Sequence, residues 1–505
     1  MKGYATFFII SVMTIGLLFL LLTRARTPYK APAEEIEIVA DAGDGGADAG
    51  EAGAALDAAA EAAAPPPKPA ERPLRITTLG WELAAAGVAL AAPDGGVTVG
   101  PPIELAPETS LDQVEARLGR TGADAVGADI AIMPLPAFVV AYDRVRRLDL
   151  RAFAVVGFSR GRDEVHASAG ALTKAPPAAD EVKLVAFAPP TANEASAKAA
   201  GSESATVLGL FALDLLGVAP ARVRFVAPGS ADAKGASFSA IVRGATDDRK
   251  LAFSTGDATA LVPIVAIAPR KLLDESEGKM KDFAKAWFEG LARANKDASS
   301  VTRRLANKEA VPLGAGVGGA PEAIALLDRL GQIEPAPLDK QRMLLGADAK
   351  GSASLETLMT RTWQLAKAGG LTTAGAPDPL PVDGRIVASI APAPPTPPHA
   401  PEGDGGGPDA GVASFAPLAA GATTLVVYRA VDPSADSASV AAQIGFLSAV
   451  FEKAAFRVSA KGGEKAARAI ATQARDRFSL PANRLATVTA EPTGAFATVE
   501  VVSLP

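Results

Sequence analysis

The sequence predicts an α/β protein that is followed by a small α+β domain. Within residues 73–390, short apolar runs of strand length alternate with longer helical segments, a pattern typical of α/β architecture. Residues 416–505 instead read strand, helix, strand, helix, strand, strand. A chain of 505 residues has room for both units and for further segments.

The N-terminus predicts a membrane anchor and a linker. Residues 5–23 contain no charged side chain, and a bilayer-spanning helix needs ~20 such residues. Basic residues, rather than a cleavage site, follow in "RARTPYK", so we expect an uncleaved transmembrane signal anchor in residues 1–30. Residues 31–72 are mostly Ala, Gly, Asp, Glu and Pro, which predicts a disordered acidic linker. The basic residues after the span favour, by charge alone, a cytoplasmic body.

Composition excludes several kinds of site. The chain has no cysteine, two histidines and a net charge of −6. Thiol chemistry is therefore absent, a His-based metal site or dyad is not expected, and the charge argues against nucleic acid. We expect no metal and no cofactor. One histidine, His399, lies in the Pro/Gly-rich stretch 391–415, which predicts a second linker.

The expected core elements follow from apolar runs and helical periodicity. In residues 281–295 Phe283, Trp287 and Leu291 recur at helical spacing. Residues 354–370 show a similar stripe, and 204–218 are apolar on nearly all sides, which predicts a buried helix. The expected strands lie in 73–81, 128–138, 151–158, 181–190, 222–229 and 258–269.

Residues 157–161, Gly-Phe-Ser-Arg-Gly, fit the G-x-S-x-G pattern of a hydrolase nucleophile elbow. A catalytic serine also needs a base within hydrogen-bond reach. His399 lies in a linker, and His166 follows Ser159 too closely in the chain to serve. We therefore expect no enzyme activity here. The segment is either a plain glycine-rich turn or a turn that lines a ligand cleft with Ser159, Arg160 and Gly161.

The order of motifs resembles the periplasmic solute-binding proteins of ABC transporters, in the nitrate/sulfonate/taurine and thiamine-precursor group. The matching motifs run from "LRITTLGW" through "GADIAIMPLPAF" and "GSESATVLGLFALDLLGV" to "FSTGDATALVPIVAIAP". The resemblance implies two α/β lobes with a ligand between them. One lobe would comprise 74–165 and 270–390 and the other 166–268, with crossings near 165–167 and 262–268.

The resemblance also implies which strand-to-helix loops face the ligand. For several of these positions a purely structural role remains as an alternative to ligand binding. Ser202 fits an anion site or a plain helix cap, and Arg160 fits an anion partner or a solvated charged turn with Arg162 and Asp163. Trp81 fits a stacking residue or a buried structural one, and Asp257 an amine partner or a turn cap. The expected ligand-binding residues are Gly80, Trp81, Pro134, Ser159, Arg160, Gly161, Ser202, Ser204 and Asp257.

Residues 416–505 resemble the OmpA-like peptidoglycan-binding domain in element order and in 468–492. The resemblance assigns peptidoglycan binding to Arg468. The loop before it, "AKGGEKA", lacks the aspartate of the family, which indicates a degenerate domain.

We predict a single-pass inner-membrane protein. The resemblance implies that its body is periplasmic, against the charge of the residues that follow the span. It would capture a small polar or anionic solute for ABC-type transport or sensing, with a permease as partner. The alternative is a structural or scaffolding envelope protein with a vestigial cleft. A third possibility is an enzyme that uses pyridoxal phosphate or a metal. The chain lacks the histidines and the clustered carboxylates that such an enzyme would need, so we do not expect one.

Overall fold

The computed structural model describes residues 72–92, 96–172, 181–186, 202–245, 247–346, 353–392, 415, 418 and 421–503. The predicted membrane anchor and nearly all of the two predicted linkers lie outside these residues. Within the described ranges, none of the helices combines the length and the apolar character needed to cross a membrane.

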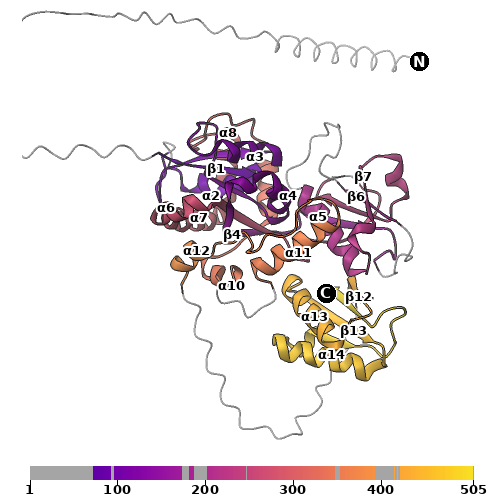
Figure 1. Ribbon diagram of the computed structural model, residues 1–505. Coiled ribbons are helices and arrows are strands. Elements are labelled where there is room, and N and C mark those ends of the chain that lie inside the picture. The colour runs from indigo at the N-terminus through magenta and orange to yellow at the C-terminus, as the bar shows by residue number, and fades with distance from the viewer. Residues whose placement is uncertain are drawn as a thin grey trace, which may run out of the picture. The chain divides into compact units, whose positions relative to one another are not determined.

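The first lobe, in which Figure 1 labels β1 and β4, is built on a six-stranded sheet with the strand order β11-β4-β10-β3-β1-β2. β1 pairs in parallel with β2 and β3, whereas β10 runs antiparallel to β3 and β4. The mixed sheet confirms the α/β class. The strands are β1 (Leu74–Leu79), β2 (Ile103–Glu108), β3 (Ile130–Pro134), β4 (Leu150–Ser159), β10 (Pro263–Pro269) and β11 (Ile333–Pro335).

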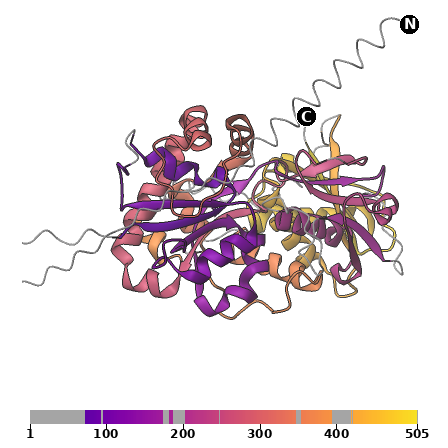
Figure 2. The same ribbon diagram turned by 90° about the horizontal axis from the view of Figure 1, so that it is seen from above.

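Helices lie on both sides of this sheet (Figure 2). α2 packs along α7 on one side, and α3 packs on α4 on the other. The predicted stripe of 281–295 falls in α7, where Phe283 and Trp287 are buried. The first-lobe helices are the 3-10 helix η1 (Trp81–Ala84), α2 (Ala85–Leu90), α3 (Leu111–Arg120), α4 (Leu135–Val145), α6 (Arg270–Glu275), α7 (Glu277–Lys296), α8 (Ala298–Asn307), α9 (Ala323–Gly331), α10 (Gln341–Leu344), α11 (Leu355–Ala368) and α12 (Arg385–Ile390).

The second lobe has a five-stranded sheet with the order β7-β6-β8-β5-β9. Helix α5 (Ser202–Leu215) packs on this sheet and also contacts α4 and α11 of the first lobe. Contacts on several sides explain why the helix is apolar nearly all round. The strands are β5 (Asp163–Ala167), β6 (Val182–Ala186), β7 (Val223–Val226), β8 (Phe238–Val242) and β9 (Lys250–Ser254).

Two segments of chain join the lobes, and their positions correct the sequence prediction. All of β5 pairs in the second sheet, and all of β10 pairs in the first. The crossings are therefore residues 160–162 and 255–262, rather than 165–167 and 262–268. The first crossing turns at Gly161, whose φ of 79° favours glycine. The run 128–138 was also misread in part, because β3 ends at Pro134 and α4 begins directly after it.

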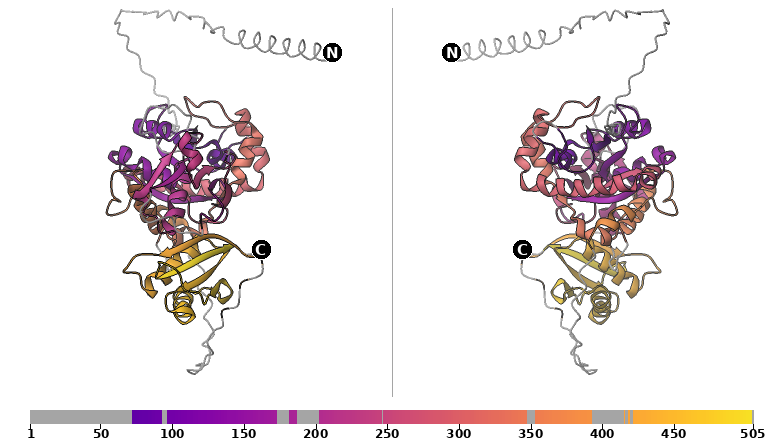
Figure 3. Two further views of the ribbon diagram at one scale, coloured as in Figure 1. Left: turned by 90° about the vertical axis from the view of Figure 1, so that its right-hand side faces the viewer. Right: turned by 90° about the vertical axis from the view of Figure 1, so that its left-hand side faces the viewer.

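The C-terminal domain has the predicted order of elements, β12-α13-β13-α14-β14-β15. Its sheet has the order β12-β15-β13-β14, and both helices pack on β13 and on each other (Figure 3). Phe446 and Phe451 of this domain contact Phe211 and Phe253 of the second lobe, with ring centroids 6.3 and 5.9 Å apart. The elements are β12 (Thr423–Ala430), α13 (Ser437–Val450), β13 (Ala454–Ala460), α14 (Gly463–Phe478), β14 (Leu485–Thr487) and β15 (Ala497–Ser503).

The seam between α2 and α7 supports a first prediction. A methyl group on Gly290 of α7 would overlap the backbone carbonyl of Ala86 in α2. Because a backbone cannot move aside as a side chain can, Gly290→Ala should lower the free energy of unfolding by about 1–3 kcal/mol. Urea denaturation measures this change.

The matched control is Gly278→Ala in the same helix, where nothing lies within 4 Å of the added methyl group. This substitution should be neutral or stabilising, because alanine is the better helix former by roughly 0.5–1 kcal/mol. Equal effects of the two substitutions would contradict the close approach of α2 and α7.

Candidate functional site

The first crossing holds a buried hydrogen-bond network around Ser159. The Ser159 hydroxyl donates to Oδ2 of Asp163 at 2.7 Å and lies 3.0 Å from the hydroxyl of Thr255 in the second crossing. The Thr255 hydroxyl also accepts from the backbone N–H of Gly161 at 2.9 Å. The network thus ties the two crossings together. Ser159 is followed by strand β5 instead of a helix, so the segment lacks the geometry of a nucleophile elbow.

An ion pair links the two lobes beside this network. Glu82, in η1 directly after β1, accepts a 2.9 Å hydrogen bond from Nη1 of Arg162. The backbone carbonyl of Arg162 accepts a hydrogen bond from the backbone N–H of Arg243 in the second lobe. The side chains of Glu82 and Arg162 are 1% and 11% exposed. Gly80 makes room for the carboxylate, because its φ is 114° and a Cβ there would overlap the Glu82 side chain. The Glu82–Arg162 pair and the Ser159 network thus place bonded polar groups where the first lobe meets the first crossing.

Asp163 carries the strongest electrostatic perturbation in this region. Its carboxyl is fully buried, and this desolvation raises its pKa from 3.8 to about 6. The charge of Arg162 and the hydrogen bond from Ser159 oppose the rise, whereas Glu203 and Glu164 add to it. The predicted alternative, in which Arg162 and Asp163 form a solvated charged turn, is wrong, since both are buried.

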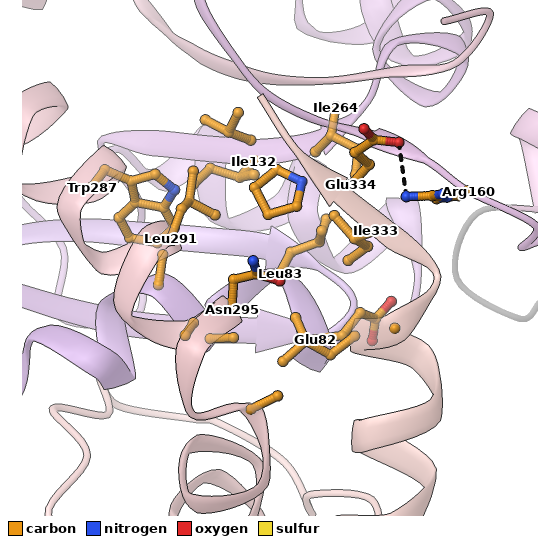
Figure 4. A pocket seen from close by; sticks show the side chains of 18 of the residues that line it. Glu82, Leu83, Ile132, Arg160, Ile264, Trp287, Leu291, Asn295, Ile333 and Glu334 are labelled. Carbon is orange, nitrogen blue, oxygen red and sulfur yellow. Dashed lines mark ion pairs between the residues drawn. The ribbon is translucent and has the colours of Figure 1, made fainter. Parts of the chain in front are cut away.

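A cavity of about 480 Å³ lies next to the ion pair, inside the first lobe. It opens between the sheet, through β3, β4 and β10, and a wall made of η1, α2, α7, α9 and β11. Most of the lining residues are apolar, among them Ile132, Ile264, Leu291 and Ile333, although polar atoms contribute about half of the surface that faces the cavity (Figure 4). The volume falls in the range that small-ligand pockets occupy, about 300–1,000 Å³.

A few polar groups line the cavity. At one end Arg160 forms a half-exposed ion pair with Glu334, with 3.2 Å between nitrogen and oxygen (Figure 4). Glu82, Asn295 and Trp287 complete the polar lining. Two of these groups are buried and have no hydrogen-bond partner among the described residues, namely Oε2 of Glu82 and Nε1 of Trp287. The arrangement can bind a molecule, but it offers no nucleophile with a base.

Two predicted ligand residues are structural in this fold. Trp81 is 1% exposed and belongs to the core of the first lobe, so its indole has no free face for a ligand. Pro134 is buried as well, at the point where β3 ends and α4 begins. Both were chosen because they follow apolar strands, and the same property places them in the core.

The remaining predicted residues divide between the network and local turns. Asp257 accepts the backbone N–H and the hydroxyl of Ser254, so it caps the turn after β9, as the structural alternative predicted. Ser204 is buried, and its hydroxyl has no partner among the described residues. The side chain of Ser202, at the start of α5, lies outside what the structure describes. Arg468 pairs with Glu464 of its own helix at 2.8 Å.

Sequence reasoning missed the residues that matter most here. The sequence contained a weak indication that Glu82 belongs to the site, because it is an acidic residue directly after Gly80-Trp81 at the end of a predicted strand. Trp287, Asn295 and Glu334 carried none, because they come from elements far along the chain. In the described part of the chain, no group of three or more His, Cys, Asp or Glu side chains is placed to hold a metal ion.

The raised pKa of Asp163 predicts a pH effect on stability. Between pH 4 and 6 the folded state binds more protons at this carboxyl than the unfolded state, so its contribution to stability falls as the pH rises and is constant above about 6. The loss over this window is about 3 kcal/mol or less. Asp163→Asn should remove this pH-dependent part of the free energy of unfolding. Urea denaturation of the variant and the parent from pH 4 to 7 measures the change. An unchanged difference between variant and parent across the window would contradict the assignment.

No protein-family model and no curated protein matches this chain. The ligand-binding component of an ABC-type import system from Staphylococcus aureus, with zinc bound, is 12% identical over 64% of this chain and 100% of that chain, with a TM-score of 0.40. The aliphatic sulphonate-binding protein SsuA from Escherichia coli is 15% identical over 63% and 91%, with a TM-score of 0.39. The alkanesulfonate-binding protein SsuA from Xanthomonas axonopodis, bound to MOPS, is 13% identical over 64% and 98%, with a TM-score of 0.36. These are likenesses of the backbone, and no ligand or residue role is transferred from them.

Proposed function

We propose that residues 73–390 form a solute-binding protein that captures a small molecule for ABC-type import or for sensing. The observation that carries this proposal is the cavity of about 480 Å³ beside the segments that join the two lobes. Its position suits a binding protein, because ligand contacts there can change how the lobes meet. The resemblance of the motif order to the nitrate/sulfonate/taurine group agrees with it.

The two-lobed architecture supplies the response to ligand. Only residues 160–162 and 255–262 connect the sheets, so the lobes can move about these segments. A ligand that favours one arrangement shifts the population toward it. The Glu82–Arg162 pair supports the arrangement described here, because it joins η1 of the first lobe to the crossing residue whose carbonyl accepts a hydrogen bond from the backbone N–H of Arg243 in the second lobe.

The setting of this domain in the cell is also part of the proposal. An anchor in residues 1–30 would hold the protein in the inner membrane, and the acidic linker 31–72 would present the body in the periplasm. The permease of an ABC transporter would be the partner for import. The C-terminal domain would act as an OmpA-like module, and peptidoglycan binding through Arg468 would require it to leave Glu464.

The alternative function is a scaffold of the cell envelope. It is favoured by the way Glu82 and Arg162 occupy the polar space between the lobes. The cavity beside that pair favours solute binding over this alternative.

Filling the cavity tests the proposal. Ala298, the first residue of α8, lines the cavity and is half-buried. A thermal-shift screen of sulfonates, nitrate, amino acids, pyrimidines and uncharged amphiphiles on the parent protein should reveal a stabilising class. A ligand at a hundred times its Kd adds about 2.7 kcal/mol of stability. Ala298→Phe should abolish that stabilisation, because the ring takes up the space of the ligand.

The control is Ala292→Phe, on the exposed side of α7, which should retain the response. If no class of solute stabilises the parent protein, the scaffold is the better account. If ligand stabilises Ala298→Phe and Ala292→Phe equally, the solute binds outside this cavity.

A further inference from the structure

Helix α13 of the C-terminal domain is apolar on two faces. On one face Ile444 and Leu447 are fully buried, and the helix packs on α14, β13 and β15 of its own domain. Another face, which we call the docking face, carries Ala442, Phe446 and Ala449 at helical spacing. These three residues border cavities whose other walls come from the first lobe and the second crossing. A helix that is apolar nearly all round is expected to be covered on several sides, and here the solute-binding lobes supply the second cover.

The docking face is held on the second lobe by apolar contacts. Phe446 lies against Phe211 of α5, and the two rings, which are 8% and 0% exposed, have centroids 6.3 Å apart. Such aromatic pairs add to the stabilisation that burial alone provides. After β12, Val431 lies against the end of α5, where a Cβ on Gly217 would come within 3.1 Å of the Val431 methyl groups. The C-terminal domain therefore packs directly on α5.

The end of α13 contacts both ends of the second crossing. Phe451 packs against Phe253 in β9, with ring centroids 5.9 Å apart. The carbonyl of Val450 accepts a hydrogen bond from the backbone N–H of Ala260 at 3.4 Å. Phe253 belongs to the second sheet, whereas Ala260 lies shortly before β10 of the first sheet. Two consecutive residues thus contact the chain on either side of the turn that joins the lobes.

Arg484 fixes this end of α13 within its own domain. Its guanidinium donates to the carbonyls of Ser448 and Phe451 at 3.3 and 2.8 Å and to that of Ala454 at 2.8 Å. A cationic side chain that bonds the last carbonyls stabilises the end of a helix. Because the end of α13 is fixed in this way, a rotation of the lobes about the second crossing has to break the contact at Phe451 or the one at Val450.

We propose that the C-terminal domain restrains the two lobes. Docked through Val450 and Phe451 on both ends of the second crossing, it holds the arrangement described here, and its release permits the lobes to rotate. This inference rests on the proposed function, because it names how the solute-binding lobes are regulated. By linkage, a solute that changes the arrangement of the lobes changes the docking equilibrium of the domain by the same factor.

Charges on the docking face test the restraint. Phe446→Lys should release the domain, because the ammonium would be desolvated against the ring of Phe211 and would share a cavity with Arg361. Ala442→Lys is a second variant, since Ala442 is half-buried on the docking face and lies outside the domain's own core. The matched control is Gln473→Lys, which adds the same charge at an exposed position of α14.

Hydrogen exchange of the full-length protein reports docking and folding together. In Phe446→Lys and Ala442→Lys the amides of residues 255–262 should exchange faster than in the parent, because the crossing loses its cover. The amides of β13 and β15 should stay protected, which shows that the released domain is still folded. Gln473→Lys should match the parent in all of these segments.

Label distances then measure the lobes themselves. The chain has no cysteine, so spin labels attach only where cysteines are introduced. Lys285→Cys in α7 and Ala231→Cys in the second lobe mark the two lobes at exposed positions. Double electron–electron resonance should give one narrow distance distribution in the labelled parent and in Gln473→Lys. Phe446→Lys should widen it by roughly twofold or more, because the crossing is no longer held at both ends.

The outcomes separate the restraint from the proposed function. The restraint is overturned if neither docking-face variant speeds exchange of residues 255–262, or if a variant does so while the label distances stay those of Gln473→Lys. If a solute of the screen above stabilises the protein in that case, the solute-binding function still stands. If no solute does but Phe446→Lys widens the distribution, the restraint stands and the scaffold is the better account of the function.

Discussion

The arrangement of the two lobes depends on a buried ion pair between Glu82 and Arg162. Glu82 lies in η1, directly after the first strand of the first sheet, and Arg162 lies in the first crossing, directly before the first strand of the second sheet. Charges that are removed from water are costly unless they are paired. The pair therefore stabilises the observed arrangement of the two lobes. The hydrogen bonds among Ser159, Asp163 and Thr255 add to this stabilisation, because they join the two crossing segments.

The Glu82–Arg162 pair lies between the crossing segments and the cavity of the first lobe. Several polar groups beside the crossings bond to one another, whereas Oδ1 of Asp163 and the hydroxyl of Ser204 have no partner among the described residues. That region is where the resemblance predicted ligand contacts. The cavity lies inside the first lobe, between the sheet and the wall made of η1, α2, α7, α9 and β11.

The fold followed from the sequence more reliably than the site. Alternating apolar runs predicted β1, β4, β6, β7 and β10, and the stripe through Phe283 and Trp287 predicted α7, because burial periodicity is a local property of the chain. The strands β2, β5, β8 and β9 were not among the predicted runs. In β5 the sequence "DEVHA" opens with two acidic residues and contains no apolar run. The cavity could not be predicted, because Glu82, Trp287 and Glu334 meet only through the tertiary fold. A buried tryptophan with an unpaired N–H is indistinguishable, in sequence, from one whose N–H is bonded.

A double-mutant cycle on Glu82 and Arg162 tests the central claim most directly. Glu82→Gln, Arg162→Met and the double variant would be compared with the parent by urea denaturation. The account predicts a coupling energy of about 1–3 kcal/mol between the two positions, as expected for buried partners in contact. Additive effects, with a coupling near zero, would contradict the role of this pair in joining the lobes.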